Sequence, residues 1–254
     1  MRLLWLMALA ACGHAVAIKW TQVPAATAKN LTSVACTKTG DVYAIDDAGG
    51  LHDLRGHATP PAPDPAKAAA AKFKLPHTVR YGQTQIAAVA RDHAHVYALG
   101  RFMAIGNSLE EEYAFLLRSD DGGATWAEVW DGPDRGPMGM GNRHDPDVGT
   151  ALAVIPWGVV LARTDGAVLI SNDLGKTFES HATGAASLLA ALWASPTGAL
   201  YGVGARGEIV VSTDRGESFD RVHEGDADLT AITGCGDEIW IVGARGTVLS
   251  RRSR

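Results

Sequence analysis

The feature that most constrains this chain is a short pattern that occurs three times, beginning at residues 119, 171 and 212. Its form is S-x-D-x-G-x-[TS]-[WF], where x is any residue. Self-similarity of this kind is typical of repeat proteins, in which each unit buries its apolar surface against its neighbours. The defining residues are Ser119, Asp121, Gly123 and Trp126, then Ser171, Asp173, Gly175 and Phe178, then Ser212, Asp214, Gly216 and Phe219.

The residue types in the pattern predict a tight turn that leads into a strand. An aspartate carboxylate can accept hydrogen bonds from backbone N–H groups of its own turn. The glycine supplies a position with positive φ, and the aromatic residue anchors the next strand in the core. We therefore expect Asp121, Asp173 and Asp214 to build the fold and to have no catalytic or metal-binding role.

Short apolar runs surround each copy of the pattern and predict four strands per unit. Four strands in about 40–50 residues is the blade of a β-propeller. The predicted strands are 86–90, 96–100, 115–119 and 126–130 around the first copy, 151–155, 159–162 and 167–171 before the second, and 188–194, 200–204 and 208–212 before the third.

Two incomplete units flank these three, at residues 31–54 and 229–251. The first lacks the pattern, and its outer strand is predicted at 73–79. The last stops after three strands, and the N-terminal segment 18–23 resembles its missing fourth strand. Pairing of that segment with the last unit would close the ring and cover an open edge. We expect five blades, or six if residues 55–82 or 131–148 contain another.

The threefold pattern resembles the Asp-box (BNR) repeat of sialidases, sortilin-type receptors and photosystem II assembly-factor propellers. The resemblance implies an all-β fold, a propeller of four-stranded blades that forms one domain over residues 12–254. It implies no cofactor. Assembly factors of this type carry an arginine patch on one face. Sialidases need an arginine triad, a tyrosine nucleophile and an Arg-Ile-Pro segment, and no such segment occurs in this chain.

The N-terminus has the character of an export signal. Arg2 precedes a short apolar stretch, and Leu9-Ala10-Ala11-Cys12 looks like a bacterial lipobox. We expect residues 1–11 to be a signal peptide and Cys12 to carry the lipid anchor. Gly13 favours the outer membrane over inner-membrane retention. The alternative is an ordinary secretory signal that is cleaved elsewhere.

Cys36 and Cys235 are the two cysteines that remain after export. Each ends the predicted innermost strand of its blade, and ring closure makes these two blades neighbours. Export permits a disulfide, which would staple the seam between the blades. The alternative is a pair of buried free thiols.

Arginines follow the second strand of several predicted blades. Gly-Ala-Arg-Gly occurs twice and places Arg206 and Arg245, while Arg101 and Arg163 stand at roughly the same place in two other blades. Guanidinium groups gathered at one pore mouth suit a carboxylate, a phosphate or an acidic protein partner. The alternative is that they are solvated, or paired with Asp165 or Glu208.

These observations favour a non-catalytic binding or scaffold propeller of the bacterial envelope, monomeric, which recognises a protein or anionic ligand on the face opposite the Asp-boxes. A net charge of −5 argues against non-specific nucleic-acid binding. We expect no metal site, and we expect Glu110–Glu112 to lie in a solvated turn within 102–112. The alternatives are a sialidase-like glycosidase and a purely structural envelope protein.

Overall fold

The computed structural model describes residues 18–25, 27–56, 83–92, 94–105, 110–130 and 148–252. Their regular structure is antiparallel β-sheet, apart from two single turns of 3₁₀ helix. Within these ranges no helix has the length and apolar character needed to cross a bilayer. The chain is therefore an all-β protein, as its repeat predicts.

The strands form five sheets, each built from strands consecutive in sequence except where the N-terminal strand joins the last sheet. The 3₁₀ turns are η1 (Ala205–Gly207) and η2 (Ala244–Gly246). The sheets, called blades 1 to 5, are β2 (Leu31–Cys36), β3 (Val42–Asp46) and β4 (Leu51–Asp53); β5 (Gln83–Arg91), β6 (Val96–Ile105), β7 (Glu110–Ser119) and β8 (Ala127–Trp130); β9 (Val148–Ile155), β10 (Gly158–Arg163), β11 (Val168–Ser171) and β12 (Glu179–His181); β13 (Leu189–Ala194), β14 (Leu200–Gly204), β15 (Ile209–Ser212) and β16 (Asp220–His223); β17 (Leu229–Cys235), β18 (Glu238–Gly243), β19 (Val248–Arg252) and β1 (Thr21–Gln22).

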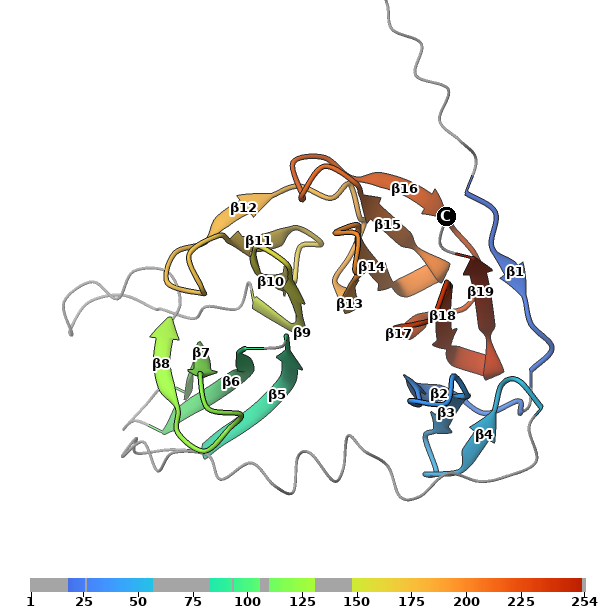
Figure 1. Cartoon of the computed structure of the whole chain (residues 1–254), viewed down its shortest axis with the longest axis horizontal. Coiled ribbons are helices and arrows are strands. Elements are labelled where there is room, and N and C mark those ends of the chain that lie inside the picture. The colour runs from blue at the N-terminus through green and yellow to red at the C-terminus, as the bar shows by residue number, and fades with distance from the viewer. Residues whose placement is uncertain are drawn as a thin grey trace, which may run out of the picture.

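The five blades lie around a common centre, with β2, β17, β13, β9 and β5 innermost (Figure 1). Neighbouring inner strands contact each other from β5 through β9, β13 and β17 to β2. This is a β-propeller, and the five blades formed by the described residues agree with the count expected from the sequence. The outer strand predicted at 73–79, and the segments 57–82 and 131–147 that bear on a sixth blade, lie outside the described residues.

The hydrophobic core lies between the blades. Four clusters of buried side chains each join two neighbouring blades, namely blades 2 and 3, 3 and 4, 4 and 5, and 5 and 1. The middle strands of blades 3, 4 and 5 are therefore covered on both faces, and Val159 to Ala162 of β10 are all fully buried. This explains why these strands are continuous apolar runs without the alternation of a half-exposed sheet.

The N-terminal strand completes blade 5, as predicted. Thr21 pairs with Ser250 and Gln22 with Leu249, and the N–H of Val23 donates to the carbonyl of Val248 at 2.9 Å. Only two residues form the strand, fewer than the 18–23 predicted. The pairing nevertheless covers the free edge of β19, which would otherwise be open to association with another chain.

The three repeated patterns form three closely similar turns, here called the aspartate turns (119–126, 171–178 and 212–219). In each, the serine hydroxyl donates to the aspartate at 2.8 Å and accepts from the glycine N–H at 2.7–2.8 Å. The aspartate also accepts the backbone N–H and the hydroxyl of the Thr or Ser four residues on. These hydrogen bonds lower the pKa of Asp121 and of Asp214 to about 2, the Thr125 and Ser218 hydroxyls being the largest cause, and lower that of Asp173 in the same way.

The glycine of each aspartate turn has positive φ and leaves no room for a side chain in two of the three copies. Gly216 has φ +89°, and a Cβ there would lie 2.1 Å from Cδ1 of Ile170 in blade 3. The residue before it is also left-handed, yet Leu174 and Arg215 occupy that position in two turns and Gly122 in the third. The turns therefore demand glycine at one position and tolerate other residues beside it.

We predict that Gly216→Ala lowers the free energy of unfolding by about 2–4 kcal/mol, because it adds left-handed strain to a clash in the core. Gly122→Ala is the matched control, since nothing lies within 4 Å of its new Cβ, and it should cost about 1 kcal/mol or less. Urea unfolding of both variants measures the difference. Equal losses would show that the contact with Ile170 does not limit this turn.

The acidic run of blade 2 lies in a strand, so the predicted turn over 102–112 is wrong for 102–105 and 110–112. Glu110 pairs with Ile105 and Glu112 with Met103 in the β6–β7 hairpin. In this register each glutamate is paired with an apolar residue, so no acidic residue is opposite another across the hairpin. Phe102, Met103 and Ile105 also favour extended backbone, which carries the hairpin past its expected end.

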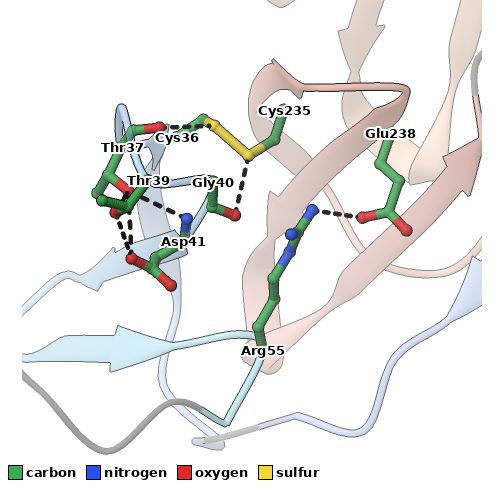
Figure 2. Close-up of a disulfide and its surroundings, with 8 residues drawn as sticks. All are labelled: Cys36, Thr37, Thr39, Gly40, Asp41, Arg55, Cys235 and Glu238. Carbon is green, nitrogen blue, oxygen red and sulfur yellow. Dashed lines mark hydrogen bonds and ion pairs between the residues drawn. A yellow bond between two sulfur atoms is a disulfide. The ribbon is translucent and has the colours of Figure 1, made fainter.

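A disulfide joins Cys36 to Cys235, with Cα atoms 5.3 Å apart. The two residues are the last of β2 and β17, so the bond spans the seam between blades 1 and 5 (Figure 2). Arg55 and Glu238 form an ion pair of 2.6 Å across the same seam. The first and last blades are thus linked covalently, over a separation of 199 residues, as well as by packing.

We predict that loss of this disulfide lowers the free energy of unfolding by up to about 5 kcal/mol, the upper figure for a loop of this length. Urea unfolding of Cys36→Ser/Cys235→Ser, in a Cys12→Ser background, measures the loss. The parent should show the same loss when a reductant is added, whereas the double variant should not respond to it. A variant as stable as the oxidised parent would contradict the prediction.

Candidate binding face

The turns between second and third strands lie on the side of the propeller opposite the aspartate turns, because the strands of each blade are antiparallel. The connections from one blade to the next lie on the same side. We call this side the connector face. Over blades 4 and 5 it consists of turns 204–208 and 243–247, with connecting residues 24–25, 27–30 and 224–228.

The two Ala-Arg-Gly turns have the same backbone conformation. Arg206 has φ 53° and Arg245 has φ 54°, and the glycine after each is also left-handed. Turns with two consecutive left-handed residues favour Asn-Gly or Gly-Gly, and an arginine there costs about 1 kcal/mol. Both arginines are exposed. The same position of the two Ala-Arg-Gly turns holds the same strained residue, whereas Leu174 and Arg215 differ between the aspartate turns, and this recurrence of an exposed arginine is an indication of function.

Each of these turns is held by the connection that leads into the following blade. The N–H of Arg206 donates to the Asp228 carboxylate at 2.8 Å, and that of Arg245 donates to the Asn30 side-chain oxygen at 3.1 Å. Asp228 and Asn30 directly precede the first residues of β17 and β2. The backbone of both arginines is therefore fixed by neighbouring blades.

The two guanidinium groups differ in their contacts. That of Arg245 donates to the backbone carbonyl of Asp226 at 2.6 Å. That of Arg206 has no hydrogen bond or ion pair to any residue that the structure describes. By contrast, the left-handed Arg215 on the opposite face lies over the ring of Trp157, 5.3 Å from its centroid. Arg206 is thus left open to solvent or to a ligand.

Arg101 and Arg163 stand at other positions of their blades. In every blade the pairing between the inner strand and the second strand has a bulge near the start of the inner strand. At this bulge Arg163 occupies the position in blade 3 that Gly204 occupies in blade 4 and Gly243 in blade 5. Arg101 lies one residue further along its blade than this position. Nε and NH2 of Arg163 both donate to the Asp165 carboxylate at 3.0–3.2 Å, and NH2 of Arg101 donates to the carbonyl of Val148 at 2.6 Å. Only Arg206 and Arg245 are structurally equivalent.

Two cavities adjoin these arginines and meet at Gly225. One of about 320 Å³ is lined by Ala205, Arg206, Glu208, Arg221, Glu224 and Gly225. The other, about 210 Å³, lies beside Arg245 and includes His223, Asp226, Gln22 and Thr247 among its lining residues. Burial lowers the pKa of His223, which favours its neutral form.

The charges of the larger cavity are arranged around a buried carboxylate. Glu208 is only 4% exposed, and its oxygens accept the N–H of Ala186 at 3.1 Å and Nε of Arg221 at 2.9 Å. Arg221 also pairs with Glu224 at 2.5 Å and donates to the carbonyl of Gly184. Arg221 is thus held against the blade, and it supplies a second guanidinium beside that of Arg206.

Strand register shows that residues at matching positions of blades 4 and 5 line the two cavities, and that these residues differ in charge. Arg221 pairs with Val210 of β15, and Gln22 pairs with Leu249, the matching residue of β19. Thr247 likewise follows its Ala-Arg-Gly turn where Glu208 follows the other. The charged pair of blade 4 is therefore a neutral pair in blade 5. Sequence reasoning missed Arg221 and Glu224, although the Glu208/Thr247 difference between two otherwise identical turns was a visible signal.

The same face carries a second buried carboxylate, in blade 1. Asp46 is 2% exposed and contacts Nε2 of His52 at 2.9 Å and Nζ of Lys29 at 3.2 Å. The hydrogen bonds from His52 and from the N–H of Gly50 hold the pKa of Asp46 well below its usual range. His52 lies in β4, Gly50 in the β3–β4 turn and Lys29 in the connection from blade 5, so Asp46 stabilises the fold at the blade 5–blade 1 seam.

Three of the tyrosines that could serve as nucleophiles lie inside the blades. Tyr43, Tyr97 and Tyr201 are buried, and burial raises the pKa of Tyr43 and of Tyr97. These three buried phenols are not presented to a substrate at the surface.

Within the described ranges, no group of three or more His, Cys, Asp or Glu side chains is placed to hold a metal ion.

No protein-family model matches the chain, and no curated protein matches it in sequence. Among solved structures, YCF48 from Cyanidioschyzon merolae has a TM-score of 0.50 at 11% identity, covering 92% of this chain and 98% of that one. YCF48 bound to a D1 peptide has a TM-score of 0.50 at 13% identity, covering 92% and 97%. The GH74 enzyme of Niastella koreensis has a TM-score of 0.51 at 16% identity, but this chain spans only 37% of it. These similarities, at such low identity, establish that the chain has the β-propeller fold.

Proposed function

We propose that this chain is a non-catalytic binding propeller that recognises a protein partner through its connector face, with Arg206 and Arg245 as the principal contacts. The observation that carries the proposal is the recurrence of an exposed, left-handed arginine at equivalent turns of adjacent blades. Both backbones are fixed by the following blade, so binding loses little conformational entropy there.

The surroundings of the arginines favour a protein carboxylate over a polyanion. Glu224, Asp226 and Asp228 are exposed on the same connection, and they would repel a nucleic acid or a polyphosphate. A single carboxylate can still meet a guanidinium in a strong, charge-assisted contact. YCF48 with its D1 peptide is an example of a propeller that binds a peptide.

We further propose that the protein is exported and anchored to the bacterial envelope through a lipid on Cys12, as a monomer. The lipobox Leu9-Ala10-Ala11-Cys12 supports this. The connector face would then act at the membrane surface or in the periplasm. Fractionation of cells with wild type and Cys12→Ser tests the anchor, because the variant should leave the membrane fraction. An unchanged distribution would contradict lipidation at Cys12.

We predict that Arg206→Glu/Arg245→Glu reduces recovery of the partner from membrane extract at least tenfold, because both contacts become repulsive. Wild-type recovery should also fall as salt rises. Quantitative mass spectrometry after pull-down measures recovery. Lys176→Glu/Arg215→Glu is the matched control, since it makes the same charge change on the aspartate-turn face.

Two results would overturn the proposal. Equal recovery of the same partners by the arginine pair and by the wild type would remove the connector-face arginines from binding. Turnover of a fluorogenic sialoside by the purified protein would replace binding with glycoside hydrolysis as its activity.

A further inference from the structure

Arg221 is the fixed part of the larger connector-face cavity. It lies on β16, and its Nε contacts the buried Glu208, which is held in turn by the N–H of Ala186. Leaving the buried Glu208 carboxylate without a partner is costly, so this contact fixes the Arg221 guanidinium in place. Its NH1 nitrogen contacts the carboxylate of the exposed Glu224, which also lines the cavity.

Glu224 is the weakly held part. Its side chain is 64% exposed, and its carboxylate contacts Arg221 and no other residue that the structure describes. An exposed ion pair between residues three apart contributes little to stability. The position three residues after Gln22, the counterpart of Arg221 in blade 5, is Ala25. The internal carboxylate is therefore specific to the blade 4 cavity.

Arg206 completes the cavity with a guanidinium that has no hydrogen bond or ion pair to any described residue. The cavity thus presents one unpaired guanidinium and one that is satisfied by a replaceable carboxylate. We propose that Glu224 is an internal substitute for a partner's carboxylate: an Asp or Glu side chain of the partner displaces Glu224 from Arg221 and is bound by Arg221 and Arg206 together. This inference rests on the proposed function and identifies the partner's chemistry at that site.

Competition by Glu224 sets the affinity and the selectivity of the cavity. It shields Arg221 from free anions while no partner is present. A partner that places a carboxylate between the two guanidiniums gains both contacts and loses only one exposed ion pair. The neighbouring Asp226 and Asp228 add repulsion that favours one carboxylate over several.

The test uses a blocked peptide with a single glutamate, Ac-Gly-Ser-Glu-Ser-Gly-amide, and its glutamine counterpart as probes. NMR titration of the arginine side-chain signals of the full exported chain measures the Kd. We expect Glu224→Gln to bind the glutamate peptide about two- to fivefold more tightly than wild type, the range of one exposed ion pair. Glu217→Gln, an equal charge change in an aspartate turn, should leave the Kd unchanged, and the glutamine peptide should bind no variant.

Arg206→Ala separates failure of this inference from failure of the proposed function. If Arg206→Ala weakens binding while Glu224→Gln leaves it unchanged or weaker, the arginine site stands and the role of Glu224 is wrong. If Arg206→Ala has no effect, or if Glu217→Gln tightens binding as much as Glu224→Gln, the carboxylate site itself is wrong. Because Glu224 and Arg206 are exposed, neither substitution removes core packing.

Discussion

The structure depends on the packing of neighbouring sheets against each other. Four clusters of buried side chains join the described blades in sequence, from blade 2 through blades 3, 4 and 5 to blade 1. A sheet packed in this way loses stability if a neighbour moves away, so the ends of the chain must meet. The two-residue strand β1 adds the N-terminal segment to the last blade, and the Cys36–Cys235 disulfide and the Arg55–Glu238 pair join that blade to the first.

Because the strands are fixed by this packing, variation is confined to the turns, and the turns on the two faces are stabilised in different ways. On one face, the aspartate turns satisfy their own backbone groups through the serine and aspartate side chains. On the connector face, the Ala-Arg-Gly turns receive their hydrogen-bond partners from the next blade. The first arrangement makes a turn that any blade can carry. The second holds two arginines rigidly while their side chains extend outward, which suits recognition.

Much of the fold follows from the sequence because the repeat combines turn chemistry with a regular spacing of apolar runs, and both are local properties. The β6–β7 hairpin was harder to predict, since its length depends on cross-strand partners for Glu110–Glu112. The arginines show the same limit. Arg206 and Arg245 share a local pattern and are equivalent, whereas Arg101 and Arg163 are displaced by the register at the bulged inner strands. The contact between Glu208 and Arg221 depends on pairing between strands, so no local spacing indicates it.

The comparison of blades 4 and 5 argues that the charged cavity is more than a by-product of the repeat. Each blade has one residue directly after the Ala-Arg-Gly turn and one at the matching position of its outer strand. In blade 5 these two residues are Thr247 and Gln22, which carry no charge. Burying the Glu208 carboxylate at the same place costs desolvation energy that the neutral Thr247 avoids, so stability alone does not favour the charged pair. What the ion pair adds is a guanidinium in a fixed position beside Arg206, and only an anionic group outside the blade can make use of both.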